Sequence, residues 1–240
     1  MEVFGKSIVG ASGINADRYF ISEDIKVFAV ADGASGAFDK VAAGEYCLRA
    51  LQKANYGDSG MNPMQYLDYC FTTANNSLIE RSQKDGKLSY GTLTMAVIDN
   101  GVVTVGAIGD TPVFLISNNE IKKIVKPRKR YALAIEYNQI TEEVAERAVS
   151  SLPGCMHSMF ENYIPMVIPE VANAQCGVNP GDTVIICSDG VSDWVTKEEF
   201  LNWFGSSRSV QEVCETILEE VIERCGMSNM DDTTIVVVRV

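Results

Sequence analysis

Histidine is nearly absent from this sequence, because His157 is the single one among 240 residues. Enzymes that use an imidazole as general base therefore find little support here. We interpret His157 as a surface or loop histidine, and a cysteine–histidine dyad with Cys155 is the remote alternative. The scarcity of histidine argues against nucleophilic triads.

Paired cysteine motifs are also missing. The seven cysteines are scattered and odd in number, and none forms a C-x-x-C pair. This pattern predicts neither a disulfide framework nor a zinc site. We expect reduced, mostly buried thiols at Cys47, Cys70, Cys155, Cys176, Cys187, Cys214 and Cys225.

Positive charge is in deficit, with 20 Lys and Arg against 32 Asp and Glu and a formal net charge of −12. Phosphate backbones are bound by clustered cations, so we expect no nucleic-acid partner. One basic run stands against this background. We interpret it as a solvated loop, with attraction of a phosphorylated partner as the alternative. The basic run consists of Lys122, Lys123, Lys126, Arg128, Lys129 and Arg130.

Long apolar runs are absent as well. None approaches the ~20 residues of a membrane span, and residues 1–10 do not have the pattern of a secretion signal. We therefore expect a cytoplasmic protein without a membrane partner. Hydrophobic residues make up 46% of the chain, and no linker-like or repeated segment divides it. The expected organisation is one domain over residues 1–240.

Hydrophobic periodicity predicts strands in two runs, each accompanied by a pair of helices. The strands are expected at 3–9, 18–22, 25–31, 92–98, 102–108, 113–117, 121–125, 166–175, 182–187 and 235–238. The helices are expected at 41–54, 63–83, 141–149, 197–204 and 210–224. Thr196 with Glu199, and Ser209 with Glu212, have capping-box spacing. The pattern favours stacked sheets with helices outside.

Two of the apolar strands end on an aspartate followed by a glycine, at 27–33 (VFAVADG) and 184–190 (VIICSDG). A third acidic pair, Asp231-Asp232, precedes the final strand. Any one Asp-Gly could be only a turn. If the strand ends meet, however, several carboxylates share one small volume, where like charges resist joint ionisation. A divalent cation would resolve that conflict, so the set favours a metal site.

Five blocks resemble, in order and spacing, the motifs of the metal-dependent protein phosphatases, the PPM or type 2C family. They are VADGASG at 30–36, GTLT at 91–94, GDT at 109–111, GDTVIICSDG at 181–190 and DDTTIVVV at 231–238. Asn15-Ala16-Asp17 extends the match toward the N-terminus. The resemblance implies a divergent bacterial-type member with an α+β fold, a four-layer α-β-β-α sandwich of two antiparallel sheets flanked by helix pairs.

The resemblance also implies two metal ions at one end of the sandwich. By position, Asp32 would bridge both ions and the carbonyl of Gly33 would bind one of them. Asp189 and Asp231 would complete the coordination of the other ion, and Asp17 would hold metal-bound water. Such oxygen ligands suit Mn²⁺ or Mg²⁺ better than zinc. The implied catalytic set is therefore Asp17, Asp32, Asp189 and Asp231.

Two of the motif glycines have an expected physical role. A side chain at Gly33 would obstruct the approach of its carbonyl to an ion, and Gly190 would let the strand turn tightly into the next helix. The remaining motif residues Gly91, Gly109 and Asp110 are interpreted as scaffold rather than as catalytic groups.

Several positions depart from the family pattern. Ala34 stands where some members carry a histidine, and no arginine occurs near Ser12, where the family places its phosphate-binding arginine. Arg18 or the basic run could substitute for that arginine. The segment KPRKRY at 126–131 replaces an acidic flap motif, so a third metal ion is not expected.

These features predict a protein serine/threonine phosphatase that hydrolyses phosphoserine and phosphothreonine by direct attack of a water shared by two metals. The partner would be a phosphorylated protein, such as a Ser/Thr kinase or its target, in a signalling role. The alternative is a pseudophosphatase or phosphoprotein-binding regulatory module on the same fold. A nucleotide-using enzyme is not supported, since Gly5-Lys6-Ser7 lacks the earlier glycine of a phosphate loop.

Overall fold

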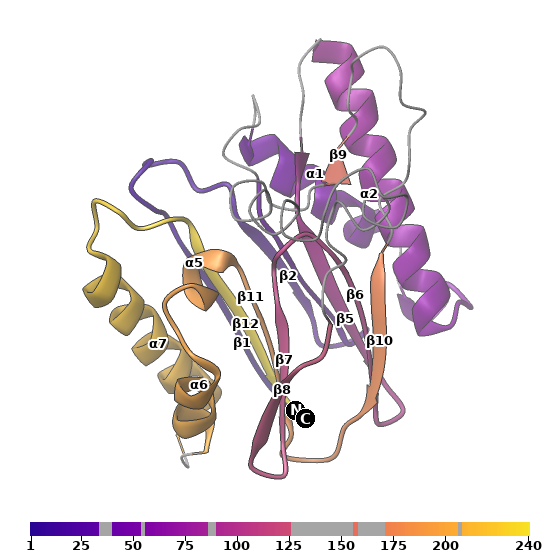
Figure 1. Cartoon of the computed structure of the whole chain (residues 1–240). Coiled ribbons are helices and arrows are strands. Elements are labelled where there is room, and N and C mark those ends of the chain that lie inside the picture. The colour runs from indigo at the N-terminus through magenta and orange to yellow at the C-terminus, as the bar shows by residue number, and fades with distance from the viewer. Residues whose placement is uncertain (34–39, 54–55, 86–89, 126–155, 158–170, 206–207) are drawn as a thin grey trace, which may run out of the picture.

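Two five-stranded antiparallel sheets lie face to face at the centre of the molecule (Figure 1). The computed structural model describes residues 1–33, 40–53, 56–85, 90–125, 156–157, 171–205 and 208–240. The first sheet has the order β1 (Glu2–Ile8), β12 (Thr233–Arg239), β11 (Thr183–Cys187), β7 (Val113–Ser117) and β8 (Glu120–Lys123). The second has the order β10 (Ala172–Gly177), β6 (Val102–Ile108), β5 (Leu93–Asp99), β3 (Val27–Ala31) and β2 (Arg18–Ser22).

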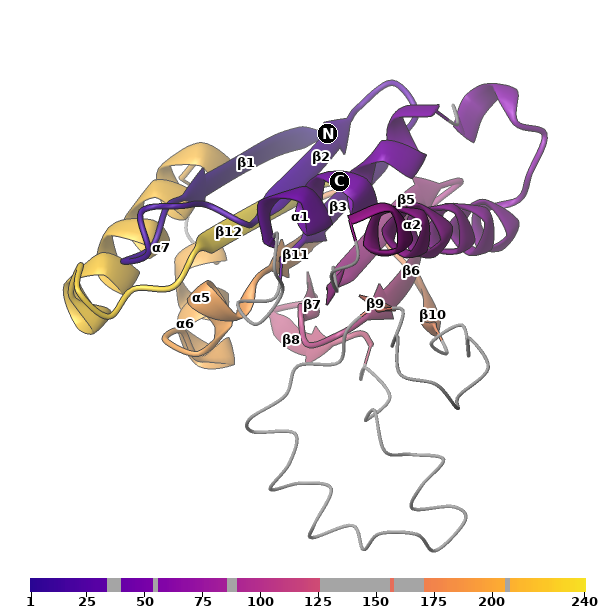
Figure 2. The ribbon, with the colours of Figure 1, turned by 90° about the horizontal axis from the view of Figure 1, so that it is seen from above.

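Helices cover the outer face of each sheet (Figures 1 and 2). The second sheet is covered by α1 (Lys40–Lys53) and α2 (Pro63–Asp85), which a short 3₁₀ turn at Tyr56–Asp58 separates. The first sheet is covered by α6 (Lys197–Phe204) and α7 (Val210–Cys225), preceded by the one-turn helix α5 (Asp189–Ser192). A two-stranded pair, β4 (Tyr90–Gly91) with β9 (Met156–His157), completes the described elements.

The inner strands β3, β5, β11 and β12 are buried on both faces, because helices and the opposite sheet cover them. In β11, Val184 and Ile186 belong to the core between the sheets, whereas Ile185 and Cys187 pack toward α6 and α7. The same alternation divides β3 between the inter-sheet core and the core under α1 and α2. Three apolar layers therefore hold four structural layers together, and the α-β-β-α sandwich predicted from the sequence is confirmed.

Most predicted elements occur within two residues of their expected limits. β2, β6, β7 and α6 have the predicted bounds, and both predicted capping boxes are formed. The turns at Asn100-Gly101 and Asn118-Asn119 have the positive φ values that tight hairpins require. The helix expected at 141–149 and the start of the strand expected at 166–175 lie outside the described residues. Helix α5 and the β4–β9 pair were not predicted.

The described cysteines are free thiols, as the sequence predicted. Five of them are buried, and Cys176 is partly buried. Among the described residues, no helix combines the length and the apolar character needed to cross a bilayer.

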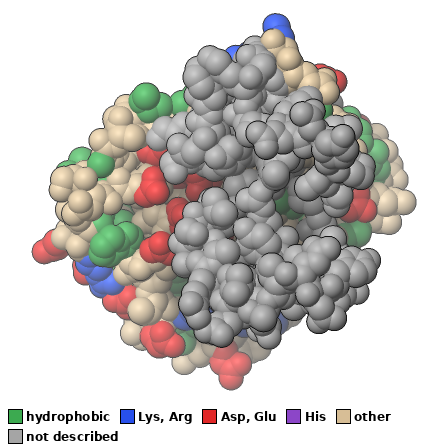
Figure 3. Space-filling view, turned by 45° about the horizontal axis from the view of Figure 1, so that its top comes forward, with side chains coloured by type: hydrophobic (Ala, Val, Ile, Leu, Met, Phe, Trp, Pro, Cys, Tyr) green, Lys and Arg blue, Asp and Glu red, His purple; other side chains and the backbone are tan. Residues whose placement is uncertain are grey.

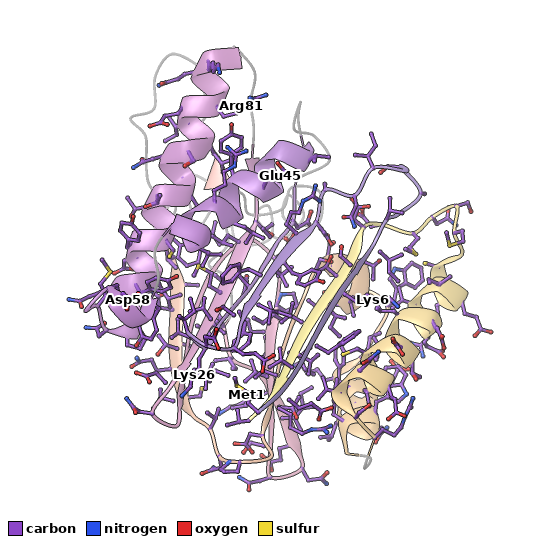
Figure 4. All side chains as sticks on the ribbon, turned by 180° about the vertical axis from the view of Figure 1, so that it is seen from behind. Met1, Lys6, Lys26, Glu45, Asp58 and Arg81 are labelled. Atoms are coloured by element: carbon purple, nitrogen blue, oxygen red, sulfur yellow. The ribbon has the colours of Figure 1, made fainter. Side chains whose placement is uncertain are left out.

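One end of the sandwich collects the segments that carry the sequence motifs. β3 and β11 end there and β12 begins there, at the upper end of the molecule in Figure 1. The chain termini and the β2–β3 turn with Lys26 lie at the opposite end (Figures 1 and 4). The aspartates that follow β3 and β11 and precede β12 are therefore delivered to the same end.

The capping box of α7 provides a test of the fold. Ser209 Oγ accepts the N–H of Glu212, and the Glu212 carboxylate accepts the N–H of Ser209. Ser209→Ala removes the hydroxyl from the cap, so we expect the free energy of unfolding to fall by about 1 kcal/mol in urea denaturation. The exposed Gln211→Ala serves as control and should change it by less than about 0.5 kcal/mol. Equal effects of both substitutions would contradict this assignment.

Candidate metal centre

The four aspartates that the sequence assigned to the site come together in the structure. The charges of Asp17, Asp189 and Asp231 all act on the carboxyl group of Asp32. The charges of Asp231 and Asp17 likewise act on Asp189. Figure 3 shows acidic side chains gathered on the face that turns this end toward the viewer. Residues up to 214 positions apart in sequence thus form one acidic cluster at the end of the sandwich.

Asp17 is the most deeply buried member, with 1% of its surface exposed. The hydroxyl of Ser188 donates a hydrogen bond to its Oδ2 atom over 2.8 Å. Its Oδ1 atom is buried and has no hydrogen-bond partner among the described residues. Burial raises the pKa of Asp17, against the effect of the hydroxyls of Thr234 and Ser188 nearby. One oxygen of Asp17 is therefore fixed, and the other is available to a cation or a water molecule.

Asp32 is held through its main chain. The N–H of Thr92 donates to the Asp32 carbonyl over 2.7 Å, and the N–H of Asp32 donates to Thr92 Oγ1 over 3.2 Å. Thr92 Oγ1 in turn lies 2.8 Å from Thr111 Oγ1. A Cβ atom at Gly91 would lie 2.5 Å from the Asp32 carbonyl, and Gly33 forms a bridge with Gly91. Gly91 therefore supports the site by close packing, as the sequence indicated.

Asp189 begins helix α5 immediately after β11. Burial raises its pKa to about 7, and the charges of Asp110 and Asp231 add to the shift. The chain passes from β11 into α5 through the single residue Ser188, so the turn is tight, and Gly190 lies outside the left-handed φ region. A Cβ atom there would instead lie 2.2 Å from the Asp232 carbonyl. The constraint on Gly190 is the close approach of the main chain that leads into β12.

Two further acidic residues lie near the site and were not predicted from the sequence to belong to it. Asp110, assigned there to the scaffold, adds its charge to the environments of Asp32 and Asp189. Its own pKa is raised mainly by burial, and its Oδ1 atom is buried without a hydrogen-bond partner among the described residues. Asp193, just after α5, has its pKa raised by burial and by Asp231. Asp110 follows an apolar strand and a glycine, a signal that could have found it.

Arg18, a predicted substitute for the missing phosphate-binding arginine, is engaged with the main chain and with Glu45. Its Nη1 atom donates to the carbonyls of Asn15 and Asp17 over 2.9 and 2.7 Å, and its Nη2 atom lies 3.3 Å from Glu45 Oε1. Figure 4 shows Glu45 on α1 close to the start of β2. Arg18 thus braces the segment that carries Asp17. Ala34 and the basic run beyond Lys123 lie outside the described residues.

The donor set of this cluster fits hard divalent cations. Buried carboxylate oxygens without partners, at Asp17 and Asp110, are costly unless a cation compensates them. Among the described His, Cys, Asp and Glu side chains, no group of three is arranged so that it could by itself hold a metal ion. Mg²⁺ and Mn²⁺ sites commonly keep several water ligands and need few protein oxygens. The residues present therefore fit Mn²⁺ or Mg²⁺, which would be held by Asp32, Asp189, Asp231 and the carbonyl of Gly33.

Comparison with known proteins places the chain in a wider context. The family model of stage II sporulation protein E (SpoIIE) matches residues 47–240. The catalytic domain of the serine/threonine protein phosphatase PstP, solved with two manganese ions, is similar with a TM-score of 0.77, 21% identity, and coverage of 98% of this chain and 96% of that one. No curated protein sequence matches the chain.

Two further phosphatase structures resemble the chain over its full length. The S. agalactiae serine/threonine phosphatase has a TM-score of 0.77 and 17% identity, with coverage of 100% of this chain and 99% of that one. The PPM Ser-Thr phosphatase MsPP from Mycobacterium smegmatis, solved with cacodylate, has a TM-score of 0.71 and 21% identity, with coverage of 100% and 98%. At these identities the likeness establishes a common fold.

The acidic cluster predicts how stability depends on pH when no divalent cation is present. The pKa of Asp189 is raised from 3.8 to about 7 in the folded chain, so the folded state holds a proton that the unfolded state has released. Because the folded state then binds more protons, the free energy of unfolding should fall as the pH rises from about 4 to about 7. One pH unit between the two pKa values corresponds to about 1.4 kcal/mol, so we expect a loss of up to about 4 kcal/mol in urea denaturation of chelator-treated protein.

Two controls separate the cluster from other titrating groups. Asp189→Asn should reduce this pH dependence, because the amide does not ionise while the raised pKa values of Asp17 and Asp32 still contribute. Mn²⁺ should restore the stability of the wild-type chain at the upper end of the range by compensating the charge. A stability that rises with pH in the presence of chelator would contradict the account.

Gly190→Ala tests the close approach of the main chain to α5. The added methyl group would lie 2.2 Å from the Asp232 carbonyl and must displace α5 or the start of β12. We expect a loss of about 1–3 kcal/mol in the free energy of unfolding, together with weaker Mn²⁺ binding in calorimetry. Gly177→Ala is a matched control, since a Cβ atom there meets nothing within 4 Å. Similar losses from both substitutions would show that this packing does not matter.

Proposed function

The chain belongs to the family of stage II sporulation protein E, a family of PPM-type phosphatases, and we propose that it hydrolyses phosphoserine and phosphothreonine in proteins. One observation carries the proposal. Asp17, Asp32, Asp189 and Asp231 converge at one end of the sandwich, with a buried carboxylate oxygen left unpartnered. A phosphate ester is an anion, so such a cluster could accept it only together with cations. The same residues that fit Mn²⁺ or Mg²⁺ therefore also favour phosphoryl chemistry.

The role that we propose for each residue follows from its position in the acidic cluster and its hydrogen bonds. Asp32, Asp189, Asp231 and the Gly33 carbonyl would hold two divalent cations, and the two-manganese structure of PstP, a protein of the same fold, supports this assignment. When bound, such a pair of cations lowers the pKa of a water molecule and offsets charge on the phosphoryl oxygens. Thr92 fixes the main chain of Asp32 before any substrate arrives. No histidine is needed in this arrangement.

Asp17 has a separate part in the proposal. Ser188 donates a hydrogen bond to its Oδ2 atom and so fixes the orientation of the carboxyl group. The Oδ1 atom is left without a partner among the described residues, and it could accept a proton or a hydrogen bond from an attacking water. Burial raises the pKa of Asp17, which makes it a better proton acceptor than an exposed aspartate. The water oxygen would then bond to phosphorus as the bond from phosphorus to the seryl or threonyl oxygen breaks, and that oxygen would take a proton from solvent. No covalent phosphoenzyme is needed.

As substrate we propose a phosphorylated protein, such as a Ser/Thr kinase or its target, in a signalling role. The free thiols of the described cysteines fit a reducing compartment such as the cytoplasm. The pseudophosphatase alternative would keep the fold without turnover. The convergence of the four aspartates argues against it, because nothing in simple partner binding requires several carboxylates to meet around a buried one.

The proposal is tested by hydrolysis of p-nitrophenyl phosphate with Mn²⁺ and with chelator. The wild-type chain should hydrolyse the ester only with Mn²⁺. Asp189→Asn should lower the rate by more than about 100-fold, which exceeds the usual effect of changing a residue that only hydrogen-bonds to a metal ligand. Asp58→Asn, at an exposed position of the 3₁₀ turn (labelled in Figure 4), should keep wild-type activity.

Two outcomes would speak against the proposal in different ways. Equal inactivity of the wild-type chain and Asp189→Asn in Mn²⁺ would remove the enzymatic function. If calorimetry then showed Mn²⁺ binding by the wild-type chain alone, the regulatory alternative would take its place.

A further inference from the structure

Asp232, the neighbour of Asp231, is used by the main chain of a distant segment. It is buried, with 4% of its surface exposed. Its Oδ1 atom accepts the N–H of Gly10 and its Oδ2 atom accepts the N–H of Ala16, each over 2.8 Å. The two carboxylates of the Asp231-Asp232 pair thus have different roles. The charge of Asp231 acts on the acidic cluster, whereas Asp232 binds two backbone amides.

The two amides stand at the two ends of one connection. Residues 10–16 make up most of the connection from β1 to β2, at 9–17, and lead directly into Asp17. This connection lies against residues 230–232, since the N–H of Ala11 donates to the Met230 carbonyl over 2.7 Å. A Cβ atom at Gly10 would lie 2.5 Å from that same carbonyl. One carboxylate therefore closes the connection at both ends, where the two backbones touch.

Asp17 is held by the same strand end through a second route. Ser188 Oγ donates to Asp17 Oδ2 over 2.8 Å and accepts the N–H of Thr234 over 3.0 Å. The N–H of Ser188 donates to the Thr234 carbonyl over 2.9 Å. Asp232 fixes the main chain beside Asp17, and Ser188 fixes its side chain. Both anchors belong to the end of the first sheet that also carries Asp189 and Asp231.

We propose that Asp232 is a positioning residue, whose two hydrogen bonds hold Asp17 in place against Asp32 and thereby set the affinity of the site for divalent cations. This inference rests on the proposed function in that it takes the acidic cluster to be a cation site. It assigns to Asp232 no contact with metal or substrate. Its effect passes entirely through the connection at residues 10–16.

A carboxylate is required at this position because both of its oxygens act as acceptors. Asparagine has the same shape but only one acceptor oxygen, and its amide group would meet an N–H donor. Asp232→Asn therefore breaks one of the two bonds and leaves two donors opposed in a buried place. Partners that orient ligand groups from outside the metal's own coordination commonly change metal affinity by about 10–100-fold.

The experiment compares Asp232→Asn with Asp182→Asn in Mn²⁺ calorimetry. Asp182 is also buried and also accepts a backbone amide, that of Asn179 over 2.9 Å, but it stands at the opposite end of β11. We expect Asp232→Asn to weaken Mn²⁺ binding by about 10–100-fold and Asp182→Asn to leave it unchanged. In an Asp17→Asn background, Asp232→Asn should cause no further loss, because its effect passes through Asp17.

Amide hydrogen exchange gives a readout that does not depend on metal. The amides of Gly10 and Ala16 should exchange slowly in the wild-type chain and at least about tenfold faster in Asp232→Asn. If the variant does not fold, the wild-type exchange decides. Protection of both amides comparable to that of β12 supports the proposal, and exchange as fast as in an unfolded peptide overturns it.

Other results would also overturn the proposal. Faster exchange of Gly10 and Ala16 with unchanged Mn²⁺ affinity would show that the connection does not position the site. An equal loss from Asp232→Asn with and without Asp17 would show that Asp17 is not the link. A wild-type chain that binds no Mn²⁺ refutes the inference, whereas one that binds Mn²⁺ without hydrolysing phosphate esters refutes only the proposed function.

Discussion

The repulsion among buried carboxylates is the constraint on which this structure depends. Asp17, Asp32 and Asp189 are all taken from water far enough for burial to raise their pKa values. Such an arrangement opposes folding, because ionised groups of like sign lose hydration and repel each other. It persists because two sheets, buried on both faces, fix the strand ends from which these residues extend. The apolar layers make the sheets rigid, and this rigidity keeps the aspartates close together despite their repulsion.

A second set of buried polar groups connects the strand ends to the aspartates. Thr92, just before β5, bonds to the main chain of Asp32 and meets Thr111, in the connection from β6 to β7. Ser188 joins the end of β11 to Asp17. Asp232 adds a carboxylate that neither faces solvent nor belongs to the cation ligands. Buried networks of this kind stabilise one arrangement when every member has a partner. The unpartnered oxygens at Asp17 and Asp110 are then the exceptions that mark where a ligand belongs.

Much of the fold and part of the site could be predicted from the sequence. The bounds of β6, β7 and α6 follow from local periodicity and capping, which depend on residues close in sequence. The four aspartates of the acidic cluster followed from motif order. The roles of Arg18, Gly190 and Asp232 could not be predicted, because each depends on contact with a distant segment. The hydrogen bond from Gly10 to Asp232 spans 222 positions, and no periodic pattern encodes such a pairing.

The most direct test of the central claim is a crystal structure of the protein grown with Mn²⁺ and measured at the manganese absorption edge. The account predicts two anomalous peaks at the end of the sandwich, both within coordination distance of an Asp32 oxygen, with Asp189 and Asp231 on one of them. It would be contradicted by an Asp32 carboxylate without a neighbouring peak under conditions in which the protein turns over phosphate esters.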